Sequence, residues 1–112
     1  MTVDESGVMI EINDFRKFCS AEKIRWSKHG LERIQTRDIS FDDVKNCVMN
    51  GEIIEVYPED YPHPSALIFG RTLDGKIIHV VCGLDGNFLY FITAYFPDTT
   101  KFLEDLRTRR KK

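Results

Sequence analysis

The sequence predicts an α+β domain in which N-terminal helices precede a four-stranded antiparallel sheet and a C-terminal helix follows it. Three observations predict this order. Up to about residue 50, apolar residues recur every three or four positions, as in amphipathic helices. Residues 52–96 instead hold short apolar and aromatic runs separated by turn residues, as strands do. After Pro97 the helical spacing returns. We expect the helices to lie on one face of the sheet.

Residues 1–23 are predicted to form an N-terminal extension, and residues 24–112 the main domain. Within the extension, residues 1–7 are expected to be disordered. Residues 13–23 read "NDFRKFCSAEK", which begins with an asparagine, a preferred helix cap, and then places apolar side chains at helical spacing. The extension is therefore expected to contain a short amphipathic helix.

Two further helices are predicted before the sheet. The first runs from about Ser27, a suitable cap, to Arg37. The second follows Ser40, and Asp43 three residues later completes a capping-box pattern. Gly51 is a typical stop for this second helix.

Four runs rich in β-branched and aromatic residues predict the strands: residues 52–57, 65–71, 76–82 and 87–96. Asp74-Gly75 and Asp85-Gly86 separate the last three runs, and such dipeptides are strong hairpin signals. The strands are therefore expected to form an antiparallel meander. Residues 98–112 are predicted to form a C-terminal helix with one apolar side and a basic end.

The composition argues against several classes of protein. The net charge of −2 does not suit a general nucleic-acid binder. The apolar runs are shorter than the roughly 20 residues that cross a bilayer, and the N-terminus lacks a signal-peptide pattern. We therefore expect a soluble, cytoplasmic protein without a membrane partner. Positive charge is concentrated between Lys23 and Arg37, which fits a focused phosphate site or an ordinary solvated surface.

The three cysteines, Cys19, Cys47 and Cys82, are far apart and form no C-x-x-C pair. Neither a zinc ribbon nor a disulfide framework is expected. Their apolar neighbours indicate small buried thiols. A nucleophilic cysteine is the alternative if the fold brings His29 or His79 alongside.

The predicted helix over residues 27–37 carries the first candidate site residues. His29, Arg33 and Arg37 stand four residues apart, so they lie on one helix face. This face is either an ordinary solvated surface or a site that binds phosphate.

The predicted strands add three polar candidates: Arg71 before a turn, His79 within an apolar run, and Tyr95 late in the last strand. Each also has a structural interpretation, as a solvated strand end, a hydrogen-bonded core histidine or a half-buried tyrosine. In RNA cleavage without a metal, histidine transfers protons, arginine binds the charged phosphate, and tyrosine assists if its pKa is perturbed. We predict no metal and no cofactor, because the acidic residues do not stand with histidines at ligand spacing.

Residues 24–98 resemble the family catalogued as domain of unknown function 4258. The shared pattern is W-S-x-H with arginines four and eight residues further on, N-G-x-I-I-x-x-Y-P, G-R-T, H-V-V and I-T-x-Y-x-P. That family is similar to the RelE, BrnT and MqsR toxin fold, in which helices precede a curved antiparallel sheet. The resemblance places the following residues on motif positions: His29, Arg33, Arg37, Arg71, His79 and Tyr95.

The resemblance implies a RelE-like endoribonuclease toxin of a toxin–antitoxin system. Its partners would be RNA, such as mRNA free or on the ribosome, and a co-encoded antitoxin. The expected reaction is attack by the RNA 2′-hydroxyl that leaves a 2′,3′-cyclic phosphate. His29 or His79 would move protons, the three arginines would hold phosphate, and Tyr95 would orient the scissile group or assist proton transfer. The alternatives are a catalytically inert protein- or RNA-binding module and a housekeeping domain whose polar helix face is merely solvated.

Overall fold

The structure is a computed structural model that describes residues 2–3 and 9–111. In chain order, its elements are β1 (Thr2–Val3), β2 (Met9–Ile10), α1 (Ile12–Ser20), β3 (Ile24–Trp26), α2 (Lys28–Thr36), α3 (Phe41–Asn50), β4 (Glu52–Tyr57), β5 (Ser65–Arg71), β6 (Ile77–Leu84) and β7 (Leu89–Tyr95). The disorder expected over residues 1–7 lies outside the described residues, except for Thr2–Val3, which pair with β2 in a small antiparallel sheet.

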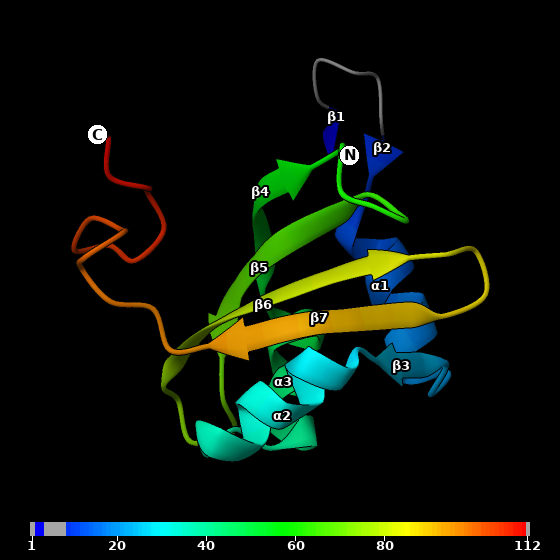
Figure 1. The fold of residues 1–112 in the computed structure, drawn as a ribbon, viewed down its shortest axis with the longest axis horizontal. Coiled ribbons are helices and arrows are strands. Elements are labelled where there is room, and N and C mark those ends of the chain that lie inside the picture. The colour runs from blue at the N-terminus through cyan, green and yellow to red at the C-terminus, as the bar shows by residue number, and fades with distance from the viewer. Residues whose placement is uncertain (1, 4–8, 112) are drawn as a thin grey trace.

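The main sheet has five strands in the order β3-β7-β6-β5-β4 and is mixed, not antiparallel throughout. Strands β4 to β7 form the expected meander. The prediction of a four-stranded antiparallel sheet was nevertheless wrong, because β3 adds a fifth strand parallel to β7. This strand has only three residues, too few to show a period of two, and Ile24 pairs with the distant Leu89. Figure 1 shows β3 beside β7 at the edge of the sheet.

The predicted C-terminal helix was also wrong. Residues after Tyr95 form turns closed by an isolated β-bridge between Phe102 and Arg109. The carboxylate of Asp105 accepts the N–H groups of the second and third residues after it, and Leu106 has a left-handed φ of 58°. Local side-chain to backbone bonds of this kind compete with helix formation. We call residues 97–111 the C-terminal segment, and Figure 1 shows it turning away from the helices as it leaves β7.

The cap residues define the two helices that precede the meander. The Ser27 hydroxyl accepts the Gly30 N–H at 2.9 Å, so the predicted start of α2 is confirmed. Ser40 and Asp43 form the predicted capping box of α3. Helix α1 begins earlier than expected, with Glu11 at the cap position and no side-chain cap bond.

All three helices lie on one face of the sheet and share its core (Figure 1). Phe15 of α1 joins this core, and Val44, Ile68 and Val80 are fully buried in it. Helix α2 lies very close to β7, because a Cβ on Gly30 would stand only 2.5 Å from the Ile92 carbonyl oxygen. Gly30 therefore allows the close contact that holds α2 beside the edge of β7.

Candidate active site

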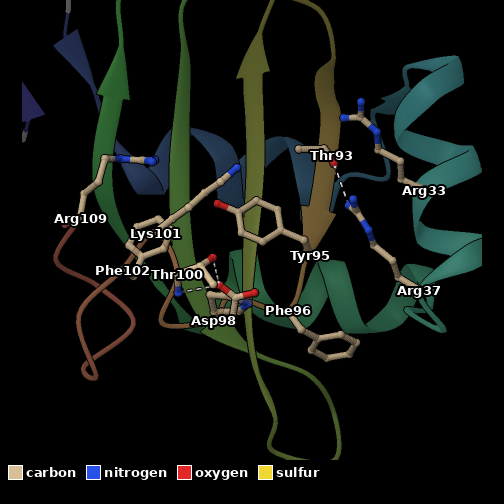
Figure 2. A pocket seen from close by; sticks show the side chains of 11 residues that line it. Arg33, Arg37, Thr93, Tyr95, Phe96, Asp98, Thr100, Lys101, Phe102 and Arg109 are labelled. Atoms are coloured by element: carbon tan, nitrogen blue, oxygen red, sulfur yellow. Dashed lines mark hydrogen bonds between the residues drawn. The ribbon is translucent and has the colours of Figure 1, made fainter. Parts of the chain in front are cut away.

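A cavity of about 560 Å³ lies where α2, β7 and the C-terminal segment meet. In Figure 2, Thr93 and Tyr95 project from β7. On one side of them are Arg33 of α2 and Arg37 just after this helix, and on the other is the C-terminal segment. The cavity is lined by Arg33, Arg37, Thr93, Tyr95, Phe96, Pro97, Asp98, Thr100, Lys101, Phe102 and Arg109.

Among the described residues that line the cavity, four side chains are cationic, and Asp98 is the single carboxylate. Arg37 donates to the Ala94 carbonyl oxygen at 2.9 Å, which fixes its guanidinium against β7. Arg109 binds the Glu55 carboxylate through two hydrogen bonds of 2.9 and 3.0 Å. In the part of the chain that the structure describes, the side chains of Arg33 and Lys101 make no hydrogen bond or ion pair. The cavity is therefore positively charged and suits a phosphate group.

His79 is fully buried directly behind Tyr95, its partner across the β6–β7 ladder. The Tyr95 hydroxyl lies 3.2 Å from His79 Nδ1, and His79 Nε2 lies 2.6 Å from the Leu106 carbonyl oxygen. A carbonyl only accepts, so Nε2 carries the proton of the neutral ring and Nδ1 accepts the Tyr95 O–H. A hydrogen-bonded chain thus runs from the cavity through Tyr95 and His79 to the C-terminal segment.

Burial sets the protonation states in this chain. It lowers the pKa of His79, although the bond to the Leu106 carbonyl acts in the opposite direction. Burial also raises the pKa of the Tyr95 phenol. The resting pair near neutral pH is therefore a neutral imidazole that accepts a hydrogen bond from a neutral phenol.

The C-terminal segment covers the outer face of the sheet, the face opposite the helices. The buried ring of Phe102 meets His79 edge to face, with ring centroids 4.7 Å apart. Two ion pairs attach the segment to β4, from Arg107 to Glu52 and from Arg109 to Glu55. These contacts place the Leu106 carbonyl at the imidazole and Arg109 at the cavity.

Residues 26–96 match the family described as a domain of unknown function (DUF4258). The chain belongs to this family. Neither a curated protein nor a solved structure matches it. The matched region runs from the last residue of β3 to the residue after β7 and includes all six residues predicted for the site. Lys101 and Arg109 of this DUF4258 protein lie beyond it.

The structure brings four of the six predicted residues together. Arg33, Arg37 and Tyr95 line the cavity, and His79 supports Tyr95 from behind. The side chain of His29 is 82% exposed, lies 3.9 Å from the Glu32 carboxylate, and does not line the cavity.

Arg71 is also outside the cavity of this DUF4258 protein. Its guanidinium donates to the Gly75 carbonyl oxygen at 2.9 Å within the β5–β6 turn, and it borders a separate cavity of about 610 Å³.

Lys101 and Arg109 were missed as site residues by reasoning from the sequence. Both were assigned to a helix, and Arg109 was considered only as part of its basic end. Their place in the site depends on the bridge between Phe102 and Arg109 and on the distant pairing with Glu55. The apolar residues near them, Phe102, Leu103 and Leu106, have helical spacing and gave no local signal for this site.

The cysteines of this DUF4258 protein are free and buried, as predicted. Burial raises the pKa of Cys47 to about 12, and it also raises the pKa of Cys19 and of Cys82. Such thiols are poor nucleophiles. Among the described residues, no group of three or more His, Cys, Asp or Glu side chains could hold a metal ion. No helix in the described ranges is long and apolar enough to span a membrane.

Proposed function

We propose that this DUF4258 protein is a metal-independent endoribonuclease that cleaves RNA by attack of a 2′-hydroxyl on the adjacent phosphate. One observation carries the proposal: the Tyr95 hydroxyl, hydrogen-bonded to buried His79, lies in a cavity with four cationic side chains. The sequence motifs resemble the DUF4258 family, and the similarity of that family to the RelE, BrnT and MqsR toxin fold supports the same activity.

Tyr95 and His79 provide a route for the proton of the attacking 2′-hydroxyl. As the 2′-oxygen bonds to phosphorus, its proton passes to the Tyr95 oxygen, and the phenolic proton passes to His79 Nδ1. The imidazolium so formed keeps its Nε2–H bond to the Leu106 carbonyl oxygen, 2.6 Å away. The bond from phosphorus to the 5′-oxygen breaks, and that oxygen takes a proton from water. The hydroxide left behind takes up the Tyr95 proton as His79 Nδ1 returns its proton to the phenol oxygen, which restores the neutral pair. The products are a 2′,3′-cyclic phosphate and a 5′-hydroxyl.

The cations stabilise the charge that develops on the phosphate oxygens. Arg37 is held on the Ala94 carbonyl oxygen beside Tyr95, and Arg33 lies one helical turn before it on α2. Lys101 faces them from the C-terminal segment (Figure 2). Planar guanidinium groups bind two phosphate oxygens at once, which also fixes the direction of attack. His29 and Arg71 take no part in this mechanism.

The cellular role that we propose is that of a RelE-like toxin controlled by a cognate antitoxin. The resemblance and the cationic cavity support this role. Expression of the protein without an antitoxin is then expected to arrest bacterial growth. Expression of the Tyr95→Phe variant in its place is expected to leave growth normal. If the wild-type protein and the Tyr95→Phe variant arrest growth equally, the toxicity does not depend on this site.

A second candidate is a catalytically inert module that binds RNA through the same cavity. The observation that favours it is the burial of His79, which lowers the pKa of the imidazole and makes it a weaker proton acceptor. In that case the four cations bind phosphate and the Tyr95–His79 pair is structural.

Incubation of the purified protein with RNA in excess chelator, with and without ribosomes, tests the proposal. Wild-type protein is expected to yield 2′,3′-cyclic phosphate ends, and Tyr95→Phe to lower the cleavage rate about 100-fold. Arg37→Ala is expected to weaken both RNA binding and cleavage. Arg25→Ala is the matched control, because Arg25 stacks on Phe88, 4.1 Å from its ring centroid, outside the cavity. RNA binding without any cleavage would overturn the nuclease and favour the inert module.

A further inference from the structure

We propose that Phe96 is the stacking platform for a nucleotide base whose phosphate lies in the cationic cavity. The inference rests on the phosphate site of the proposed function and adds the place of the neighbouring base. It makes Phe96 the residue through which the protein binds a nucleotide more tightly than a bare phosphate.

Phe96 is an unusually placed aromatic residue. It follows Tyr95 at the end of β7, and the residue is 39% exposed although its side chain is large and apolar. Phe96 is the first residue after β7, and it lines the cavity together with Tyr95. Figure 2 shows the ring at one end of the cavity, separate from the Tyr95 phenol.

The same ring borders a second cavity of about 390 Å³, which lies between the end of α2, the start of α3 and the β5–β6 turn. Phe96 is thus shared by the two cavities. A nucleotide carries its phosphate and its base on one ribose, so two adjoining spaces with an aromatic residue between them match its parts. An exposed aromatic face next to cationic side chains is the usual construction of a site for single-stranded nucleic acid.

Charge decides which part of the nucleotide each space accepts. The second cavity is lined by Asp38, Asp43 and Asp74 against one cation, Lys76. Three carboxylates repel a phosphate, whereas the first cavity attracts it. The uncharged base is therefore the part that lies over Phe96, and the phosphate remains beside Arg33.

Lys76 lies over one face of the Phe96 ring. Its Nζ lies 5.9 Å from the centroid of the Phe96 ring, a cation–π distance. Because part of the ring is exposed, a base can still pack against it. Every base has an aromatic face, so this platform strengthens binding without requiring one particular sequence.

Titration of the isotope-labelled full-length protein by NMR, with adenosine 3′-monophosphate and separately with inorganic phosphate, tests the platform. Phe96→Ala is expected to weaken binding of the nucleotide about five- to tenfold, the lower part of the range for loss of one stacking contact. Binding of phosphate is expected to stay the same. Phe96→Trp keeps an aromatic face and is expected to retain nucleotide affinity.

Phe41→Ala is the matched control, because Phe41 is a phenylalanine of similar exposure, 50%, that lines neither cavity. Unchanged nucleotide affinity in Phe96→Ala would overturn the platform, and so would an equal loss in Phe41→Ala. If phosphate and nucleotide bind as expected but RNA is not cleaved, the platform stands and only the nuclease activity fails. If neither probe binds to the wild-type protein, the phosphate site fails and the platform fails with it.

Discussion

The two faces of the five-stranded sheet are covered by different means. On the helix face, β5 and β6 place Ile68, Ile78 and Val80 against α3 in a continuous apolar core, which α1 joins by packing on α3 and β7. On the outer face, the same β6 places His79 under a segment without regular secondary structure, held by hydrogen bonds, ion pairs and one buried phenylalanine. The helix face therefore supplies most of the stability, and the outer face carries the candidate chemistry.

This difference follows from the alternation of side chains along a strand. In "IIHVVC", every second residue faces the helices, and His79 is the polar exception on the other side. Burial of an aliphatic side chain contributes about 1.5–3 kcal/mol. A neutral hydrogen bond contributes about 1 kcal/mol net, and an exposed ion pair less. Substitutions on the two faces should thus differ clearly in their effect on the free energy of unfolding.

The largest loss of stability is expected on the helix face. Ile68→Ala removes a fully buried side chain and leaves a cavity, which should lower the free energy of unfolding by about 3 kcal/mol. Urea unfolding measures this loss, and Phe41→Ala, at an exposed position on α3, is the reference variant with a smaller effect. Similar losses for the two variants would contradict the assignment of the main core to this face.

A smaller loss is expected on the outer face. Phe102→Ala should cost about 2 kcal/mol, less than the usual core value, because the C-terminal segment can open locally while the sheet remains folded. The variant should also admit water to His79 and raise the pKa of its imidazole toward the ordinary value, because burial is what lowers that pKa. NMR titration of the His79 ring measures the shift, and an unchanged pKa would show that Phe102 does not keep water from the ring.

The same variant is expected to change the pH dependence of stability. The folded wild-type protein protonates His79 less readily than the unfolded chain does, so its contribution to stability is complete above the ordinary histidine pKa of about 6.5. That contribution decreases as the pH falls through this value toward the lower pKa of the folded state. Phe102→Ala should flatten this decrease, which urea unfolding at several pH values measures.

The smallest effect is expected for the ion pairs between the C-terminal segment and β4. Glu52→Ala removes the carboxylate partner of Arg107, whose side chain is 40% exposed. The loss should be about 0.5 kcal/mol or less and should vanish at high salt. Limited proteolysis of the segment is a more sensitive measurement, because cleavage depends on local opening. An effect as large as that of Phe102→Ala would mean that charge, not the phenylalanine, anchors the segment.

Local signals explain which elements were predictable. Ser27 and Ser40 are caps whose bonds lie within three residues, and Gly75 and Gly86 adopt the positive φ that their turns require. Strand β3 gave no such signal, because its pairing joins segments about 65 residues apart in sequence and adds a parallel strand that only tertiary contacts select.

The residues of the candidate site also fall into those that local sequence signals predict and those that they do not. Arg33 and Arg37 follow from helical spacing, and the short β6–β7 connection places His79 opposite Tyr95. The closing wall comes from a segment whose helical spacing was misleading, because Asp105 and the bridge at Phe102 override the helical pattern. His29 satisfies the spacing rule and still misses the cavity, so four-residue spacing on a helix does not by itself define a site.

The bond from His79 to Leu106 has a consequence for sequence variation. The acceptor is a main-chain carbonyl, which every amino acid possesses, so the proton position on the imidazole does not depend on the leucine side chain. The backbone at this position has a φ of 58°, a conformation that glycine and asparagine adopt more easily than leucine does. Relatives with either residue at this position would keep the same tautomer. A contact of the candidate site can therefore be kept in homologues even where the amino acid that provides it differs.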